Sequence, residues 1–330
     1  MKVFVIGSGS WGSALAQICV DNGHDVLIYG NNADEINEIN DSHTNSKYFE
    51  NVILNEHLKG TLDISKVSDA DLVVMSVPSA VTAQVCTQIQ PYLTKKVILV
   101  NTSKGFDPAT GKRMSEAIRA AFDKEKLSSV VSLIGPSHAE EVVIRMLTSV
   151  CAVSLNEEDA KTVQNVFSNN YFRVYTGSDE IGSELGVATK NSIALASGML
   201  AGLGYGDNTR AALITRGLAE MIRFGVASGG QEKTFMGLTG MGDLIVTCTS
   251  THSRNFEAGY QIGKADTSQV YWDNNHKTVE GIRTTQVLYK LKKDLHVEMP
   301  IVDEIYQVLY ENKKPSQSAK DLMLRELKAE

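Results

Sequence analysis

The sequence predicts a doubly wound, mostly parallel α/β sheet in its first half and an all-α domain in its second half. Three observations support this fold class. Short apolar runs rich in β-branched residues alternate with longer amphipathic segments, a glycine-rich loop follows the first run, and the strand signals stop at about residue 180. We therefore expect two domains, one spanning residues 1–180 and the other spanning residues 181–330.

Seven runs in the first half have the composition of strands. Several are apolar at nearly every position, which is typical of strands that helices bury on both faces. Alternation of such strands with helices predicts crossover connections and a mostly parallel sheet. The runs are 3-VFVIG-7, 25-DVLIYG-30, 72-LVVMSVP-78, 97-VILVNT-102, 130-VVSLIG-135, 149-SVCAVSL-155 and 171-YFRVYT-176.

The segments after residue 180 have the length and periodicity of helices. One long uncharged segment, 191–206, is rich in glycine and too short to span a bilayer comfortably, so no membrane span is expected. We interpret it as a buried helix whose small residues permit close packing. The helical patterns cover residues 181–199, 210–228, 281–293 and 300–310.

The composition is that of a globular protein whose partners are small molecules. The chain has 330 residues, of which 42% are hydrophobic, and a net charge of -7 without a basic run, so nucleic acid is not expected as a partner. The four cysteines are far apart and lack metal-ligand spacing, which indicates reduced thiols, a cytoplasmic location and no metal site. A secretory signal at the N-terminus is the alternative, but glycines interrupt its apolar core.

The loop in 5-IGSGSWGSALA-15 has the spacing of the dinucleotide-binding fingerprint. Gly7 permits a tight turn, Gly9 allows a pyrophosphate to approach the backbone, and Gly12 lets the following helix pack closely on the sheet. That helix is expected over residues 13–23, and its first amides can donate to phosphates. The first domain is therefore expected to be Rossmann-like and to bind NAD or NADP.

The end of the second strand leaves the choice between NAD and NADP open. The strand ends 28-IYGNN-32, where an acidic residue would hold the ribose hydroxyls of NAD and an Arg would accommodate the 2′-phosphate of NADP. Neither residue type is present. Asn31 and Asn32 can hydrogen-bond to either cofactor.

Two loops of the first domain contain residues that suit an anionic ligand. Lys104 in 101-NTSKGFDP-108 follows a buried strand, at the edge where ligands bind to open sheets. In 134-IGPSHAEEV-142, Gly135 and Ser137 lead into a helix start. The alternatives are that Lys104 is a solvated loop residue and that Ser137 is an ordinary helix N-cap.

The second domain contains a comparable stretch, 253-SRNFEAGYQIG-263. Ser253, Arg254 and Asn255 open a helix and together suit a phosphate group. Ser253 could instead be an ordinary N-cap, and Arg254 could pair with a surface carboxylate.

Lys190 is the strongest catalytic candidate. It lies in 184-ELGVATKNSIALASG-198, a predicted helix of apolar and small residues. A Lys is costly in such a place unless it is paired, and burial moves a lysine pKa toward values useful in proton transfer. The alternative is a Lys whose ammonium reaches solvent at the helix edge. Asp243, expected on a glycine-rich turn in 237-GLTGMGDLIVTCTS-250, is a candidate partner for Lys190.

These motifs resemble, in order and over essentially the whole chain, the bacterial type of NAD(P)-dependent glycerol-3-phosphate dehydrogenase. The chain departs from that family at Asn31, where Arg is frequent, at His138, where Phe is usual, and at Thr278, where an aliphatic residue is usual. The seven motifs are GSGSWG at 7–12, NTSKG at 101–105, GPSHAEEV at 135–142, TKNSIALASG at 189–198, GLTGMGDLIVTCTS at 237–250, SRN at 253–255 and VEG at 279–281.

The resemblance implies reversible hydride transfer between NAD(P)H and dihydroxyacetone phosphate, giving sn-glycerol 3-phosphate for phospholipid synthesis in the cytoplasm. Lys190 would transfer the proton, aided by Lys104 and Asp243, and Trp11 would pack beside the dinucleotide unless it only anchors the helix start. Beyond the loop glycines, the implied cofactor contacts are Ser10, Trp11, Asn31, Tyr48, Lys104, Ala139, Arg254, Thr278 and Glu280. The implied substrate contacts are Lys104, Gly135, Ser137, Lys190, Asp243, Ser253, Arg254 and Asn255.

Two other functions share several of these features. Another two-domain hydroxy-acid dehydrogenase would have the same architecture and a catalytic Lys, but it would not need the phosphate-binding SRN stretch. A non-catalytic dinucleotide redox sensor would not need Lys190 in an apolar helix. We also expect a homodimer from the apolar character of the helical domain.

Overall fold

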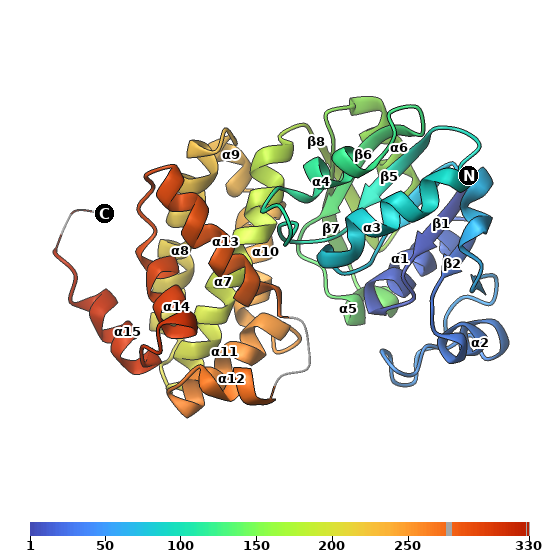
Figure 1. Cartoon of the computed structure of the whole chain (residues 1–330). Coiled ribbons are helices and arrows are strands. Elements are labelled where there is room, and N and C mark those ends of the chain that lie inside the picture. The colour runs from blue at the N-terminus through green and yellow to red at the C-terminus, as the bar shows by residue number, and fades with distance from the viewer. Residues whose placement is uncertain (275–278, 328, 330) are drawn as a thin grey trace. The chain divides into compact units, whose positions relative to one another are not determined.

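The computed structural model describes residues 1–274, 279–327 and 329. The chain divides into two compact units, Met1–Glu180 and Ile181–Glu330 (Figure 1). The first unit contains a sheet with helices on both faces, and the second is helical throughout its described residues.

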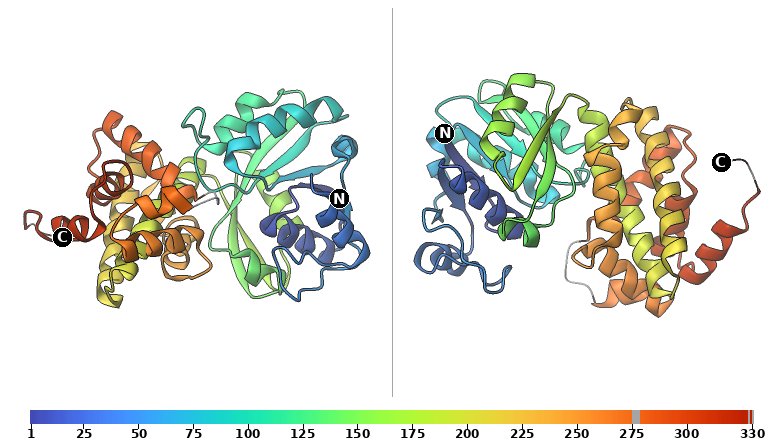
Figure 2. Two further views of the ribbon diagram at one scale, coloured as in Figure 1. Left: turned by 60° about the horizontal axis from the view of Figure 1, so that its bottom comes forward. Right: turned by 180° about the vertical axis from the view of Figure 1, so that it is seen from behind.

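The sheet of the first unit has eight strands in the order β3-β2-β1-β4-β5-β6-β7-β8 (Figures 1 and 2). All neighbouring strands are parallel except β6 and β7. The first six follow the order of the dinucleotide-binding fold, in which ligands bind at the carboxyl ends of the strands. The strands are β1 (Lys2–Ile6), β2 (Asp25–Tyr29), β3 (Lys59–Thr61), β4 (Leu72–Met75), β5 (Val97–Asn101), β6 (Leu127–Ile134), β7 (Thr148–Val153) and β8 (Phe172–Gly177).

The predicted fold class is confirmed, with two additions. The sequence analysis missed β3 because its three residues, Lys-Gly-Thr, contain no apolar run. Strand β7 is antiparallel to β6 because the connection between them carries only the five-residue helix α5 (Ala139–Val143). A parallel crossover usually returns as a helix along the strand, and the five residues of α5 span only about 8 Å, against about 26 Å for the eight residues of β6.

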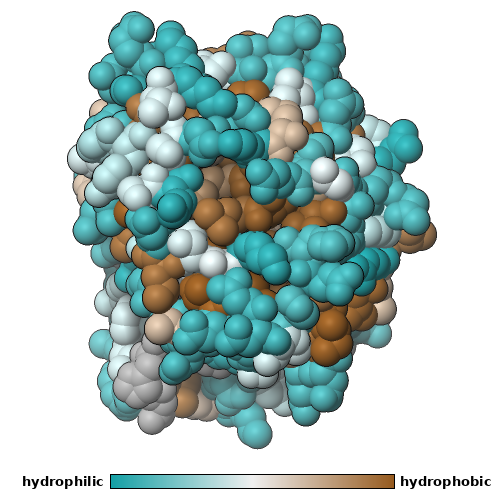
Figure 3. Space-filling view, turned by 90° about the vertical axis from the view of Figure 1, so that its right-hand side faces the viewer, coloured by the Kyte–Doolittle hydropathy of each residue, from teal (hydrophilic) through white to brown (hydrophobic). Residues whose placement is uncertain are grey.

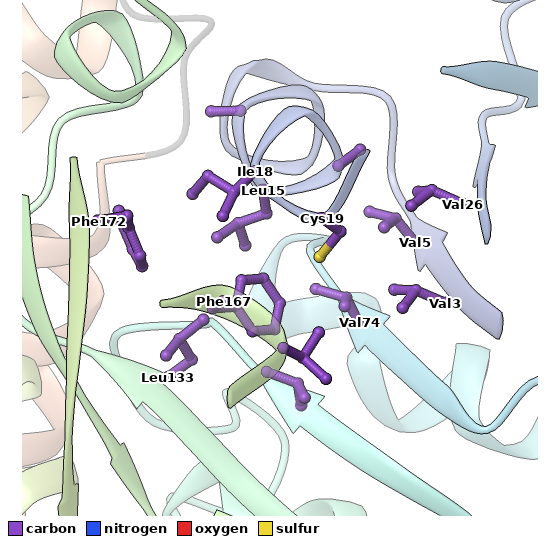
Figure 4. Packing of buried hydrophobic residues seen from close by; sticks show 14 of the residues in the cluster. Val3, Val5, Leu15, Ile18, Cys19, Val26, Val74, Leu133, Phe167 and Phe172 are labelled. Carbon is purple, nitrogen blue, oxygen red and sulfur yellow. The ribbon is translucent and has the colours of Figure 1, made fainter. Parts of the chain in front are cut away.

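Apolar residues pack against both faces of the sheet and form two cores. On the molecular surface seen in Figure 3, most of the residues are hydrophilic. Successive residues of β1 point to opposite faces, so Val5 belongs to one core and Ile6 to the other. In the first core, Cys19 of α1 lies beside Val5 and Val74, and Leu15 lies near Phe167 (Figure 4). Burial on both faces explains why β1 has a continuous apolar sequence.

The helices of the first unit cover these two cores. Helix α1 begins at Ser10, three residues earlier than predicted, so Trp11 and Gly12 lie in its first turn. The helices are α1 (Ser10–Asp21), α2 (Ala33–Asp41), α3 (Ser79–Ile89), α4 (Met114–Ala121), α5 and α6 (Glu157–Phe167), with 3₁₀ turns η1 (Ile64–Asp69) and η2 (Gln90–Tyr92).

The second unit contains the four predicted long helices as α7, α8, α13 and α14 (Figure 2). None of the helices within the described part of the chain is long and apolar enough to cross a membrane. The helices are α7 (Glu180–Gly202), α8 (Asp207–Ala227), α9 (Glu232–Phe235), the π-helical segment η3 (Leu238–Gly242), α10 (Asp243–Thr249), α11 (Arg254–Ala265), α12 (Gln269–Asn274), α13 (Glu280–Asp294), α14 (Pro300–Tyr310) and α15 (Pro315–Met323).

Glycines allow α7 and α11 to pack in close backbone contact. A Cβ on Gly198 would lie 2.0 Å from the carbonyl oxygen of Phe256, and a Cβ on Gly259 would lie 2.0 Å from that of Leu195. Side-chain carbons cannot approach an oxygen so closely, so any larger residue would push the helices apart. This contact fixes the start of α11 relative to the helix that carries Lys190.

Candidate active site

The glycine loop follows β1, and glycine is needed at its three positions for different physical reasons. Gly7 has a φ of 112°, and a Cβ on Gly12 would lie 1.9 Å from the Gly7 carbonyl oxygen, so the fold itself requires both. A Cβ on Gly9 would meet no atom within 4 Å, and its φ of -68° is accessible to any residue. Packing within the protein therefore does not explain Gly9, whereas the close approach of a pyrophosphate does. The loop fits a dinucleotide.

Trp11 and Tyr48 both pack against the apolar core of the first unit. The indole therefore anchors the start of α1, which was the alternative to a cofactor contact. Its Nε1 atom is buried and has no hydrogen-bond partner among the described residues. Because buried donors are normally paired, this atom also suits a ligand that approaches the loop.

The second strand ends beside the glycine loop, where Asn31 is exposed and Asn32 caps α2. The Asn32 side-chain oxygen accepts hydrogen bonds from the backbone nitrogens of Asp34 at 2.9 Å and Glu35 at 3.4 Å. The side-chain oxygen of Asn32 is thus committed to its own helix, which leaves Asn31 as the more accessible of the two amides.

Lys104, Gly135 and Ser137 come together beyond the ends of β5 and β6. The Lys104 Nζ atom donates to the Gly135 carbonyl oxygen at 2.7 Å and lies 3.5 Å from Ser137 Oγ. Ser137 is not a helix N-cap, because α5 begins at Ala139 and His138 occupies the cap position. Its hydroxyl donates instead to the Gly135 carbonyl oxygen at 3.0 Å. The three predicted residues thus form one polar cluster.

Lys190 and Asp243 form a buried ion pair in the second unit. The Lys190 Nζ atom lies 2.9 Å from Asp243 Oδ1, and the two side chains are 5% and 1% exposed. The same ammonium donates to Thr247 Oγ1 at 2.5 Å, and that hydroxyl donates to the Asp243 carbonyl oxygen at 2.6 Å. The carboxylate stabilises the charged form of the amine, and the hydroxyl fixes its direction.

Asp243 lies in continuous helix rather than on the turn that the sequence predicted. The π-helical segment η3 leads directly into α10, which begins at Asp243. A Cβ on Gly186 of α7 would lie 2.4 Å from the Thr239 carbonyl oxygen, so glycine at this position lets η3 approach α7. Gly186 lies one turn before Lys190, and the close contact therefore brings the carboxylate to the ammonium.

Ser253 and Arg254 form the start of α11. The Ser253 hydroxyl accepts a hydrogen bond from the backbone nitrogen of Phe256 at 3.2 Å, so this residue is an N-cap as well as a predicted substrate contact. Arg254 is the first helical residue and is exposed. An exposed guanidinium at a helix N-terminus suits a phosphate.

Asn255 connects three helices. Its Nδ2 donates to Asn191 Oδ1 of α7 at 2.9 Å, and its own Oδ1 accepts from the Gly281 backbone nitrogen of α13 at 2.8 Å. Glu280, a predicted cofactor contact, is the first residue of α13. Thr278 lies outside the described residues.

Thr247 and Asn191 were not among the site residues predicted from the sequence. Thr247 lies four residues after Asp243 on the same helix, and Asn191 directly follows Lys190, so proximity to the selected residues was the only signal available. Within the described residues there is no group of three or more His, Cys, Asp or Glu that could hold a metal ion.

A loop that fits a dinucleotide and a helical unit with a buried Lys–Asp pair define a nicotinamide-dependent dehydrogenase. Family models of NAD-dependent glycerol-3-phosphate dehydrogenase match residues 2–160 with the N-terminal part and residues 179–320 with the C-terminal part. The chain belongs to this family and is an NAD(P)-dependent oxidoreductase. The resemblance seen in the seven motifs is confirmed.

Individual relatives agree over the full length. Glycerol-3-phosphate dehydrogenase (NAD(P)+) of Enterococcus faecalis is 47% identical over 330 residues, which cover 100% of this chain and 97% of the relative. The enzyme of the same name from Lysinibacillus sphaericus is 48% identical, with coverages of 100% and 98%. The crystal structure of glycerol-3-phosphate dehydrogenase from Coxiella burnetii is 31% identical, has a TM-score of 0.89 and covers 98% of this chain and 99% of that one.

Proposed function

We propose that the protein catalyses the reversible NAD(P)H-dependent reduction of dihydroxyacetone phosphate to sn-glycerol 3-phosphate. Family membership gives the reaction class. The observation that carries the mechanism is the buried Lys190–Asp243 pair in a helix made mostly of apolar and small residues. A structural role alone does not require an ion pair there, because a buried pair is often no more stabilising than well-packed apolar residues.

The two units divide the work in this proposal. Residues 1–180 hold the dinucleotide through the glycine loop, and residues 181–330 hold the phosphorylated substrate and supply the proton. When bound, the nicotinamide supplies or accepts the hydride. Gly9 leaves the space that the pyrophosphate needs, and the first amides of α1 donate to it.

Lys190 is the proposed proton donor in reduction and the proton acceptor in oxidation. Its ammonium hydrogen-bonds to the ketone oxygen of the substrate and stabilises the negative charge that develops there. Asp243 and Thr247 hold Nζ in one position, so little reorientation is needed when the proton moves. Lys104 is proposed as a second cation that acts on the substrate.

Arg254 is the proposed anchor for the phosphate group. It is the exposed cation at the start of α11, where the helix N-terminus also favours negative charge. Asn255 and the Ser253 cap keep this helix start in place through their contacts with other residues. A fixed grip on the phosphate positions the carbonyl carbon for reaction.

The proposed setting is the cytoplasm, with the enzyme acting as a homodimer and supplying glycerol phosphate for phospholipid synthesis. We expect neither a membrane span nor a nucleic-acid partner. The substrate is a small phosphorylated ketone or alcohol.

The test is a spectrophotometric assay at about 340 nm, where reduced nicotinamide absorbs. Purified protein is mixed with dihydroxyacetone phosphate and NADH or NADPH, with unphosphorylated dihydroxyacetone and a 2-keto acid as controls. We expect rapid oxidation with the phosphorylated substrate only. Lys190→Met should lower kcat at least about 100-fold while leaving the dinucleotide Kd unchanged, and Arg254→Gln should mainly raise KM.

Other results would redirect the proposal. Faster turnover of the 2-keto acid would favour a hydroxy-acid dehydrogenase. Tight dinucleotide binding without any turnover would favour a redox sensor. Normal kcat in Lys190→Met would remove this residue from the mechanism.

A further inference from the structure

A buried carboxylate reaches the glycine loop from the helix that follows β2. Glu35 lies in the first turn of α2 and is 7% exposed. Its Oε2 atom accepts a hydrogen bond from the hydroxyl of Ser8 at 2.7 Å. Ser8 stands between Gly7 and Gly9, so this carboxylate belongs to the wall of the predicted dinucleotide site.

The other carboxylate oxygen of Glu35 is paired with Lys47. The Lys47 Nζ atom lies 2.6 Å from Glu35 Oε1, and the side chain of Lys47 is 58% exposed. Nζ also lies 5.2 Å from the centre of the Tyr48 ring, a predicted cofactor contact. The ion pair is therefore on the cofactor side of the first unit.

Packing explains why position 30, directly after β2, cannot carry an acidic residue. Strands β1 and β2 are in register, and the Gly7 nitrogen donates to the Tyr29 carbonyl oxygen at 2.9 Å. A Cβ on Gly30 would lie 2.4 Å from the Ser8 hydroxyl. Ser8 fills the space that a side chain at position 30 would need, and Glu35 of α2 brings a carboxylate to the Ser8 hydroxyl. We call the place where Ser8, Gly30 and Glu35 meet the β2 corner.

The charge of the β2 corner is negative. Segment 30–48 contains the four carboxylates of Asp34, Glu35, Glu38 and Asp41, with Lys47 as the single Lys or Arg. Since that ammonium is already paired with Glu35, it is a poor counter-ion for an added phosphate. A cofactor with a 2′-phosphate would bring negative charge toward Glu35 and the acidic segment that carries it, and discrimination by like charge is an effective source of specificity.

We propose that Glu35, held by Ser8 and Lys47, makes the protein select NAD(H) over NADP(H). The proposal deepens the proposed function and rests on it for the use of a nicotinamide dinucleotide. Glu35 excludes the 2′-phosphate, and it occupies the corner in which the fingerprint acid normally binds the ribose hydroxyls.

The decisive variant is Glu35→Gln. The amide oxygen can still accept from Ser8, whereas the charge is lost and Lys47 loses its carboxylate partner. The Kd of NADH and of NADPH is measured without substrate, by energy transfer from protein tryptophan to the nicotinamide, and kcat/KM is measured for each cofactor. We expect the wild type to bind NADH at least about 10-fold more tightly, and Glu35→Gln to bind NADPH about 10-fold more tightly than the wild type does.

Two further variants serve as controls. Glu157→Gln makes the same change in net charge on an exposed side chain in the first turn of α6, and it should leave both Kd values unchanged. Adding Lys47→Met to Glu35→Gln should abolish the gain in NADPH affinity. If the variants fold poorly, competition of 2′,5′-ADP and 5′-ADP against NADH on the wild type gives the same comparison, with 5′-ADP expected to compete better.

The proposal is overturned if the wild type binds NADPH as tightly as NADH, or if Glu35→Gln leaves the ratio of the two Kd values unchanged. Failure of the proposed function has a different signature. In that case the Kd ratio favours NADH as expected, but dihydroxyacetone phosphate is not reduced.

Discussion

Replacing Asp243 by Asn removes the carboxylate from Lys190 while keeping the shape of the side chain. Both side chains are at most 5% exposed, so water does not screen the loss. Removing one partner of a buried ion pair costs about 3–5 kcal/mol. In a unit of this size, 1 kcal/mol lowers Tm by about 2–4 °C, so Tm of the helical unit should fall by roughly 10 °C.

Activity should fall as well. Thr247 still accepts a hydrogen bond from Lys190, but the ammonium loses the group that keeps it charged and oriented. We expect kcat to fall about 100-fold because the proton donor is no longer held in one position. Calorimetry reports the stability, and the absorbance of reduced nicotinamide reports the activity.

The matched control is Asp207→Asn. Asp207 pairs with Arg210 in the same unit, but its side chain is 89% exposed. Exposed pairs contribute about 0–1 kcal/mol, so its Tm should change little. Equal losses of Tm in the two variants would refute the argument from burial, and a normal kcat in Asp243→Asn would refute the orienting role.

Three further predictions concern other parts of the molecule. Gly9→Ala should keep its Tm because a Cβ there meets no atom within 4 Å, but the NADH Kd should rise at least about 10-fold; an unchanged Kd would contradict the assignment of this space to the pyrophosphate. Burial raises the pKa of Glu220 to about 7 even though its carboxylate accepts from the Ile301 and Val302 nitrogens. Because this pKa lies above the unfolded value of 4.5, the group favours folding most below pH 4.5, and about 3 kcal/mol is lost as the pH rises through 7. Glu220→Gln should therefore flatten the decline of Tm between about pH 4.5 and pH 7, whereas an unchanged decline would assign it to other groups. Ser253→Ala should lower stability by about 1 kcal/mol through loss of the N-cap and should also raise KM, because Ser253 is a predicted substrate contact; an unchanged KM would leave the hydroxyl with the capping role alone.

Most of the fold could be predicted because its strands are buried on both faces. A continuous apolar run such as that of β5 is distinctive, and all five of its residues are buried. Strand β3 lies at the edge of the sheet and pairs only with β2, so its sequence needs no apolar run. The direction of β7 could not be predicted from its own residues, since it depends on the length of the connection before it.

The candidate site could be predicted where a residue type conflicts with its surroundings. Lys190 is conspicuous because most of its helix is apolar or small, and its partner Asp243 directly precedes an apolar run. Thr247 and Asn191 are ordinary polar residues in sequence. Their roles depend on contacts across 57 and 64 residues, to Lys190 and to Asn255, which no local pattern encodes.

The β2 corner shows how a correct sequence rule can lead to an incomplete conclusion. Counting from the glycine loop to the end of β2 finds no acidic residue, and that observation alone leaves the cofactor open. The side chain of Ser8 occupies the space above Gly30, so the first position after β2 cannot carry an acid in this chain. Glu35 reaches the same hydroxyl from the next helix. The absence of an acid from one position in the sequence therefore does not imply the absence of a carboxylate from that place in the structure.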